Sequence, residues 1–230
     1  MASQRKDIIA PGQIYHVFNR SVERRPVFTS KFEYERMREI LWYYRFTKLP
    51  MRYSQFLSLS KDARNTFRDT LRKQKEQEIT VFAFALMPNH FHLLLRQETE
   101  HGIPVYLSNI SNSFAKYFNT HHKRTGSLWQ RPFKAVRIET EEQFLHVSRY
   151  IHINPAVSFV IKEERLDIYP WTSLPEYLVG GADGICETKE IHGHFRTTHV
   201  YRKFIHDQID YAKTLEKIKH LSIDGEEEWV

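Results

Sequence analysis

Hydrophobic and polar residues alternate near the beginning of the chain. The run at residues 13–19, QIYHVFN, has the period of two that is typical of a half-buried strand. Ile14 and either Val17 or Phe18 are expected to point toward the core. The fold is therefore predicted to begin with this strand.

Three later segments also predict strands. Residues 79–86, ITVFAFAL, are continuously apolar, and residues 91–96 are again strand-like after a Met-Pro-Asn turn. Residues 127–138, SLWQRPFKAVRI, form another strand-like run that Pro132 interrupts. Because proline cannot donate a hydrogen bond to a β-ladder, the interruption predicts an edge strand or a bulge.

Apolar residues three and four positions apart predict the helices. In residues 30–46 the rhythm includes Phe32 and Met37, and Thr29 or Ser30 can cap the helix. Other helices are predicted at residues 59–77, which are charged and expected to be exposed, and at 104–123, 141–153 and 202–221. The helix at 141–153 is expected to stop before Pro155, because the residue before a proline disfavours helical geometry.

The predicted elements occur in the order strand, helix, strand, strand, helix, strand, helix. A doubly wound sheet would alternate strands and helices regularly, so this order favours an α+β fold, an antiparallel sheet with helices packed on it. The 230 residues are 41% hydrophobic, which is enough for one buried core.

Charge and cysteine content limit the kinds of partner and the cellular compartment that are expected. With 34 Lys+Arg against 28 Asp+Glu, the formal net charge of +6 favours polyanionic partners. The single cysteine, Cys186, excludes an internal disulfide framework and fits a reducing compartment. No apolar run approaches the ~18 residues of a membrane span, so a cytoplasmic protein without a membrane partner is expected.

Two histidines in a predicted strand form the first candidate site. His90 and His92 flank Phe91, and because strand side chains alternate, both imidazoles point to one face and can chelate one metal ion. We expect them on a central strand, with helices over the opposite face. An H-x-H pair alone is a weak signal, because two surface or hydrogen-bonded histidines are the more common explanation of such a pair.

A second candidate lies on the helix at residues 141–153. His146, Tyr150 and Asn154 follow one another at intervals of four, so they share one helical face, while Phe144 and Ile151 lie on another. Taken alone, this helix favours Tyr150 as an amphipathic packing residue whose hydroxyl reaches the surface.

Together these segments resemble a known family. The motifs MPNHFHLLL, GSLWQRPFK and RYIHINPAV followed by YPWTS are similar to those of REP-associated tyrosine transposases, relatives of the single-tyrosine HUH transposases of bacterial insertion sequences. YHVFNRSVERRPVF resembles that family's first strand and the loop after it. The resemblance implies a ferredoxin-like, HUH nuclease-like sandwich in residues 1–175. It also implies a protein of the bacterial cytosol or nucleoid. Residues 176–230 then form a C-terminal extension, helical in part, with an acidic cluster at residues 226–228.

The resemblance also implies roles for individual residues. His90 and His92 become metal ligands, Tyr150 the nucleophile and Asn154 the candidate third ligand. A phenol with a pKa near 10 is a poor nucleophile at neutral pH. A divalent ion, Mg²⁺ or Mn²⁺, would polarise the phosphate that Tyr150 attacks. The product would be a 5′-phosphotyrosine at a hairpin-forming repeat. Tyr117 and His121 form a competing pair, which we rank second because KYFNTHH does not match the family's tyrosine motif.

The expected DNA-binding residues lie in two basic segments. No Asp or Glu occurs between His101 and Ile138, where cations alternate with aromatic residues as in single-strand binding sites. The candidates there are Lys123, Arg124, Trp129, Gln130, Arg131 and Lys134, and a second cluster after the first strand consists of Arg20, Arg24 and Arg25. Single-stranded or hairpin DNA is therefore the expected partner.

Two other functions fit the same residues. One is a domesticated protein that binds structured single strands without cleaving them, and the other is an unrelated metal-dependent phosphodiesterase in which water is the nucleophile. A covalent protein–DNA adduct distinguishes the transposase from both. Either a monomer or a homodimer is compatible with the sequence.

Overall fold

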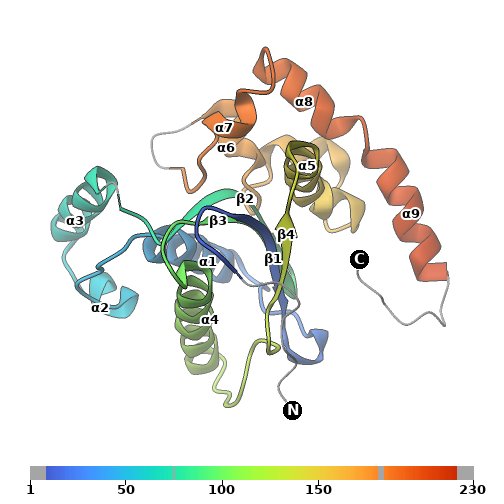
Figure 1. Cartoon of the computed structure of the whole chain (residues 1–230). Coiled ribbons are helices and arrows are strands. Elements are labelled where there is room, and N and C mark those ends of the chain that lie inside the picture. The colour runs from blue at the N-terminus through green and yellow to red at the C-terminus, as the bar shows by residue number, and fades with distance from the viewer. Residues whose placement is uncertain (1–8, 75, 181–183, 222–230) are drawn as a thin grey trace.

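A computed structural model describes residues 9–74, 76–180 and 184–221 of the chain (Figure 1). The acidic cluster at residues 226–228 lies outside the described residues. The described segments fold around one antiparallel sheet, with helices on both of its faces.

The sheet has four strands in the order β2-β3-β1-β4, and every neighbouring pair is antiparallel. The strands are β1 (Ile14–Arg20), β2 (Ile79–Met87), β3 (His90–Gln97) and β4 (Lys134–Ile138). β3 is a central strand, as predicted for the histidine pair. β4 lies at an edge, as the interruption at Pro132 predicted. The α+β fold class is thereby confirmed.

Helices connect and follow the strands. Their bounds are α1 (Lys31–Tyr44), α2 (Tyr53–Leu57), α3 (Lys61–Lys73), α4 (Gly102–His121), α5 (Glu141–Val157), α6 (Leu174–Val179), α7 (Lys189–His192), α8 (Thr198–His206) and α9 (Ile209–Leu221). Two short 3₁₀ helices are η1 (Val22–Arg24) and η2 (Glu163–Ile168). The charged α3 is largely exposed, as predicted, with Leu71 its buried residue.

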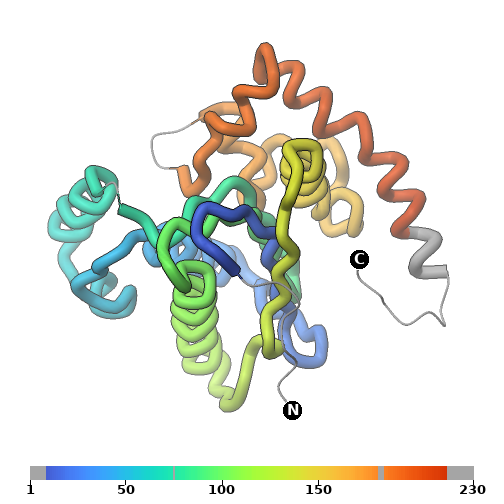
Figure 2. Tube along the Cα trace, in the orientation of Figure 1, coloured from blue at the N-terminus to red at the C-terminus, as the bar shows by residue number. Residues whose placement is uncertain are grey.

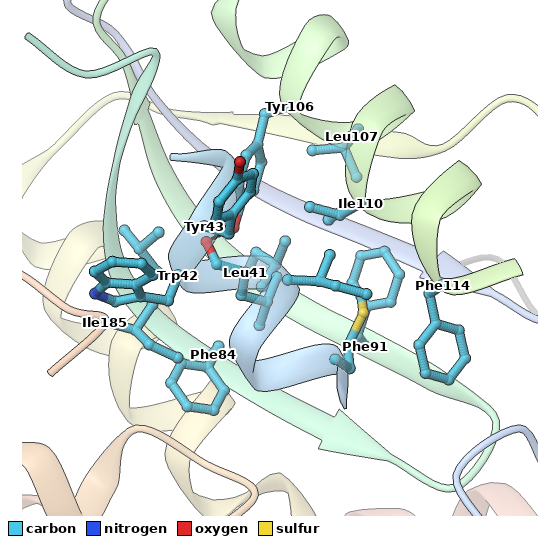
Figure 3. Close-up of a cluster of buried hydrophobic side chains, with 14 of the residues drawn as sticks. Leu41, Trp42, Tyr43, Phe84, Phe91, Tyr106, Leu107, Ile110, Phe114 and Ile185 are labelled. Atoms are coloured by element: carbon cyan, nitrogen blue, oxygen red, sulfur yellow. Dashed lines mark hydrogen bonds between the residues drawn. The ribbon is translucent and has the colours of Figure 1, made fainter. Parts of the chain in front are cut away.

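α1 and α4 cover one face of the sheet. Val17, Phe91 and Leu93 point toward these helices and are fully buried. Figure 3 shows Phe91 among apolar side chains of both helices. The hydroxyl of Tyr106 donates a 3.0 Å hydrogen bond to the carbonyl of Leu41, so the polar atom of this buried ring is satisfied.

α5 covers the other face of the sheet. α8 and α9 pack against α5, and α6 packs against α8 (Figure 2). Phe82 and Leu94 of the sheet are buried there with Ile151 of α5. Helices therefore cover both faces, whereas only the face opposite the histidines was predicted to be covered. The continuous apolar run of β2 explains the difference, because a strand buried on both faces needs no polar side.

α5 does not stop before Pro155, and that expectation is wrong. The helix continues to Val157, and the Ser158 amide donates to the Asn154 carbonyl at 2.9 Å. Pro155 removes one backbone hydrogen bond close to the end of the helix, where few later bonds depend on it. Asn154 therefore lies inside the helix, one turn after Tyr150.

Three smaller expectations also change. Phe32 is 74% exposed, because it lies five residues before the buried Met37 and hence about 140° away around α1. Of the β1 residues expected in the core, Val17 is buried, whereas Ile14 and Phe18 lie half-buried on the opposite face. Residues 202–221 contain two helices, α8 and α9, with a break at Asp207 and Gln208.

A buried polar chain joins α5, α8 and the segment before α6. The Tyr201 hydroxyl lies 2.9 Å from His152 Nδ1, and His152 Nε2 lies 2.7 Å from Ser173 Oγ. Burial lowers the pKa of His152 to about 3, so the ring is neutral. Because the Ser173 hydroxyl donates to the Phe84 carbonyl at 3.4 Å, Ser173 accepts from the Nε2–H of His152, and the unprotonated Nδ1 of His152 then accepts from the Tyr201 hydroxyl. This chain fixes the helix that carries Tyr150.

Replacing Tyr201 by Phe should destabilise the fold, because the buried Nδ1 of His152 then loses its donor. An unsatisfied buried acceptor costs about 1–3 kcal/mol of unfolding free energy. Urea denaturation measures the loss. Tyr211→Phe is the matched control, since Tyr211 is 64% exposed. Equal stabilities of the two variants would show that the chain does not support α5.

Candidate active site

Three elements meet at the candidate site. His90 and His92 are on β3, His16 and Phe18 are on the adjacent β1, and Tyr150 is on α5. The register pairs Phe18 with His92, so alternate side chains of the two strands lie on one face. α5 covers this face and brings its tyrosine to the histidines.

The rings are in contact range. The centroids of His90 and His92 are 5.0 Å apart, and those of His92 and Tyr150 are 5.5 Å apart, with nearly perpendicular planes. The Tyr150 ring also lies 5.9 Å from His16. The structure therefore brings together the two histidines and the tyrosine that the sequence singled out, although they are separated by about sixty residues in the chain.

Hydrogen bonds fix the orientation of His90. The Asn89 side-chain amide donates to the Arg24 carbonyl at 2.9 Å, which turns Asn89 Oδ1 toward His90 Nδ1 at 2.6 Å. An amide oxygen only accepts, so His90 Nδ1 carries the proton. The lone pair of His90 is then on Nε2, the atom left for a metal ion. A histidine ligand that donates its other N–H to a carbonyl oxygen is the usual arrangement in metal sites.

His16 contacts Nδ1 of His92, as Asn89 contacts Nδ1 of His90. His16 Nε2 lies 3.0 Å from His92 Nδ1, and the two rings are stacked at 5.2 Å. When His92 Nδ1 donates this hydrogen bond, its Nε2 is free to bind a metal ion. Burial lowers the pKa of both His16 and His90 to about 4, and that of the fully enclosed His92 well below 6.5. The three imidazoles are therefore neutral at pH 7, the form that coordinates metals.

Tyr150 is a protonated phenol at neutral pH. The protein packed around its hydroxyl raises the pKa above 10, and a hydrogen bond from Asn154 offsets part of this increase. The Asn154 oxygen Oδ1 lies 3.4 Å from the Ser158 hydroxyl, which donates to it. Coordination of a metal ion by Oδ1 would require the Asn154 amide to turn over.

Few protein groups at the site could hold a metal ion. Within the described residues, no three His, Cys, Asp or Glu side chains lie close enough to hold a metal ion. The candidate ligands proposed from the sequence are the two Nε2 atoms of His90 and His92 and, with its amide turned over, an oxygen from Asn154. Such a set leaves coordination positions open for phosphate, unlike a closed structural zinc site with four protein ligands.

Several expected DNA-binding cations lie around the site. Arg20 pairs in register with His90, and its charge contributes to the lowered pKa of that histidine. Lys134, on edge strand β4, pairs with Phe18 and places its ammonium 5.9 Å from the Phe18 ring. Gln130 and Arg131 are exposed in the segment that precedes β4. Arg20 and Lys134 thus place positive charge next to the histidines and Phe18.

The other basic residues expected to bind DNA, Arg24, Arg25, Lys123 and Arg124, have the following surroundings. Arg24 binds Asn89 through its carbonyl, and Arg25 forms an ion pair with Glu23. Lys123 is exposed at the turn after α4, where Arg124 donates to the Asn119 side chain at 2.7 Å.

Trp129 was expected to stack on DNA bases, and the structure does not support this. The residue is only 4% exposed and its ring lies 5.1 Å from Phe91 and 5.8 Å from Phe114. Apolar neighbours in the α1–α4 core bury the indole, so it offers no face to a base.

Tyr117 and His121, the competing pair, are on the opposite side of the sheet. Their rings are stacked on α4 at 5.9 Å, and α4 packs on the face away from His90 and His92. His16 and Asn89 were not identified from the sequence. The period of two in β1 carries information about His16, since it places this histidine on the same face as Ile14 and Phe18.

Comparisons with known proteins agree with this fold. The family model described as transposase IS200 like matches residues 43–154, just under half of the chain, and this range includes His90, His92, Tyr150 and Asn154. No curated protein matches the chain. No helix among the described residues is long and apolar enough to cross a membrane.

Two solved structures are similar to this chain. One is a REP-associated tyrosine transposase bound to a REP hairpin, with 16% identity, a TM-score of 0.52 and coverage of 82% of this chain and 93% of that one. The other is a putative transposase from Deinococcus radiodurans, with 16% identity, a TM-score of 0.34 and coverage of 66% and 95%. The resemblance found in the sequence motifs is thereby confirmed: residues 43–154 match the IS200-like transposases, and the chain shares its antiparallel α+β fold with a REP-associated tyrosine transposase.

Proposed function

We propose that this protein is a single-stranded DNA endonuclease and strand transferase that uses Tyr150 as its nucleophile. The observation that carries the proposal is the position of the Tyr150 ring, 5.5 Å from that of His92 and on the same sheet face as His90. The solved relative bound to a REP hairpin supports hairpin-forming repeat DNA as the substrate.

Each step of the reaction exchanges one phosphoester bond for another. The Tyr150 oxygen attacks phosphorus and loses its proton to solvent, while the bond from phosphorus to the 3′ oxygen breaks and that oxygen takes up a proton. The 5′ phosphate is then esterified to Tyr150. Attack by another 3′ hydroxyl reverses the exchange and transfers the strand, so no nucleotide cofactor is required.

The protein's own groups prepare this attack. Asn154 donates a hydrogen bond to the Tyr150 oxygen, which favours the phenolate that forms as the proton leaves. Arg20 and Lys134 provide positive charge beside the histidines for the DNA phosphates. A divalent ion, Mg²⁺ or Mn²⁺, held by His90 and His92 would polarise a nonbridging phosphate oxygen, and Asn154 would join as a third ligand only with its amide turned over, which removes its hydrogen bond to Tyr150.

A protein that binds hairpin DNA without cleaving it is the second candidate. The raised pKa of Tyr150 favours it, since a protonated phenol is a weak nucleophile. The two functions predict opposite results in a denaturing gel, because only the enzyme forms a covalent bond to labelled DNA.

Replacing Tyr150 by Phe should abolish the covalent adduct and cleavage of hairpin-forming, radiolabelled single strands in Mn²⁺ or Mg²⁺. The change removes one oxygen from a residue that is 38% exposed, so the unfolding free energy should fall by only about 1 kcal/mol, the usual contribution of one hydrogen bond, here that with Asn154. Tyr117→Phe removes the same atom on the other side of the sheet and should leave the adduct intact. An adduct that persists in Tyr150→Phe and maps to Tyr117 would overturn the assignment.

His90→Ala should lower the cleavage rate by about a thousandfold, since the Lewis-acid effect of a metal ion is worth several kcal/mol. Chelation with EDTA should have the same effect on the unaltered protein. DNA affinity should remain largely intact in filter binding, because phosphate contacts supply most of it. Cleavage at the normal rate in EDTA would argue against a metal ion in the reaction.

His16→Phe tests whether His16 orients His92. The substitution retains a ring but removes the acceptor, so calorimetric titration with Mn²⁺ should show affinity reduced by about 10–100-fold. His16→Gln places a carbonyl oxygen near the position of Nε2 and should restore most of the affinity. In the metal-free protein, ¹⁵N NMR should find the His92 proton on Nδ1 in His16→Gln. Equal Mn²⁺ affinities for the Phe and Gln variants would exclude this role.

A further inference from the structure

A groove lies on the side of the molecule away from Tyr150. It has a volume of about 1040 Å³ and is formed by the outer face of α4, the segment after α1, and α2. α1 and α4 pack on the sheet face opposite to that of His90 and His92. The sheet therefore separates the groove from the histidines. Its volume is at the upper end for small-molecule sites, which suits a segment of a polymer.

The groove is positively charged. Arg36, Arg52 and Lys116 line it, and within the described residues none of them forms an ion pair. Lys48 also lines it but is paired with Glu76 at 2.7 Å. The one carboxylate in the lining, Glu78, accepts a hydrogen bond from the Thr99 hydroxyl. Three uncompensated cations favour a polyanionic ligand.

Aromatic rings hold one of these cations in place. The Arg36 guanidinium lies 4.6 Å from the centroid of Tyr117 and 5.4 Å from that of Tyr53. The Tyr117 ring is half-buried, so part of it remains accessible from the groove. Aromatic rings interleaved with cations are characteristic of surfaces that bind unpaired nucleotides, where bases stack and phosphates are neutralised.

The α4 wall adds neutral hydrogen-bonding groups. α4 contains no Asp or Glu over its whole length, Gly102–His121. Asn109 and Asn112 are exposed on the groove side, and the Asn112 amide nitrogen donates to Ser108 at 3.2 Å, which leaves its carbonyl oxygen available. A strand of DNA would meet no repelling carboxylate along this helix.

We propose that this groove binds a single-stranded segment of DNA outside the cleaved phosphodiester. Arg36, Arg52 and Lys116 contact its phosphates, and Tyr117 stacks on a base. The inference rests on the proposed function, which supplies DNA as the ligand. It also assigns a role to Tyr117, the competing tyrosine, which lies across the sheet from the candidate metal ligands.

The test measures binding of a fluorescein-labelled thymidine oligonucleotide of about twelve nucleotides by anisotropy at several salt concentrations. The double variant Arg52→Glu/Lys116→Glu should bind about tenfold more weakly. The slope of log affinity against log salt should fall by about 1.4, since each single-strand phosphate contact contributes about 0.7. The control, Lys61→Glu/Lys73→Glu on α3, makes the same change in net charge at exposed positions outside the groove.

Tyrosine variants test the stacking contact. Tyr117→Ala should weaken binding of the oligonucleotide by about tenfold, whereas Tyr117→Phe retains the ring and should retain affinity. A 5-iodouracil photo-crosslink from the oligonucleotide should map to α4 in the unaltered protein and be lost in Tyr117→Ala. A crosslink that maps only to other elements would overturn the proposal.

Other results would also contradict the binding of single-stranded DNA in the groove. Equal losses in the α3 control and the groove variant would show that only overall charge matters. An equal loss for a DNA duplex of the same length would identify a duplex site instead. Adduct formation at saturating DNA should be normal in the α3 control, Lys61→Glu/Lys73→Glu, because these positions lie outside the groove. A failure of the proposed function would appear differently, as the absence of an adduct in the unaltered protein.

Discussion

The packing of α5 against β2 and β3 fixes the position of Tyr150. Phe144 of α5 meets Phe82 of β2 with ring centroids 4.8 Å apart, and Ile151 is buried in the same cluster. The hydrogen bonds of His152 with Ser173 and Tyr201 tie the helix to the segment before α6 and to α8. With α5 held in this way, Tyr150 faces the histidines from a rigid support, as a reactive geometry requires.

The charge of the side chains differs between the centre of the site and its margin. The imidazoles of His16, His90 and His92 are neutral because burial lowers their pKa values, whereas Arg20 and Lys134 place positive charge at the margin. Neutral nitrogens suit a divalent ion, and the surrounding cations suit phosphate. The same molecule presents a second cationic surface across the sheet, around Arg36.

The sequence predicted the strands, the antiparallel order and the central position of the histidine pair. It could do so because the period of two in β1, the apolar run of β2 and the H-x-H spacing are local patterns. The positions of Trp129 and His16 depended on packing between distant segments, which local periodicity does not contain. Pro155 shows a limit of another kind. The rule that a helix ends before a proline describes the average cost of a proline in a helix, and in α5 the burial of the last turn outweighs this cost.

In the proposed reaction, two successive exchanges at phosphorus pass through a tyrosine ester. The stereochemical course of strand transfer can be followed with a substrate that has a single chiral phosphorothioate at the cleaved linkage. Each in-line attack inverts phosphorus, so attack by Tyr150 followed by attack of a 3′ hydroxyl should give overall retention of configuration. Inversion in the joined product would contradict the account, because it would show that a single displacement joins the strands without a covalent intermediate.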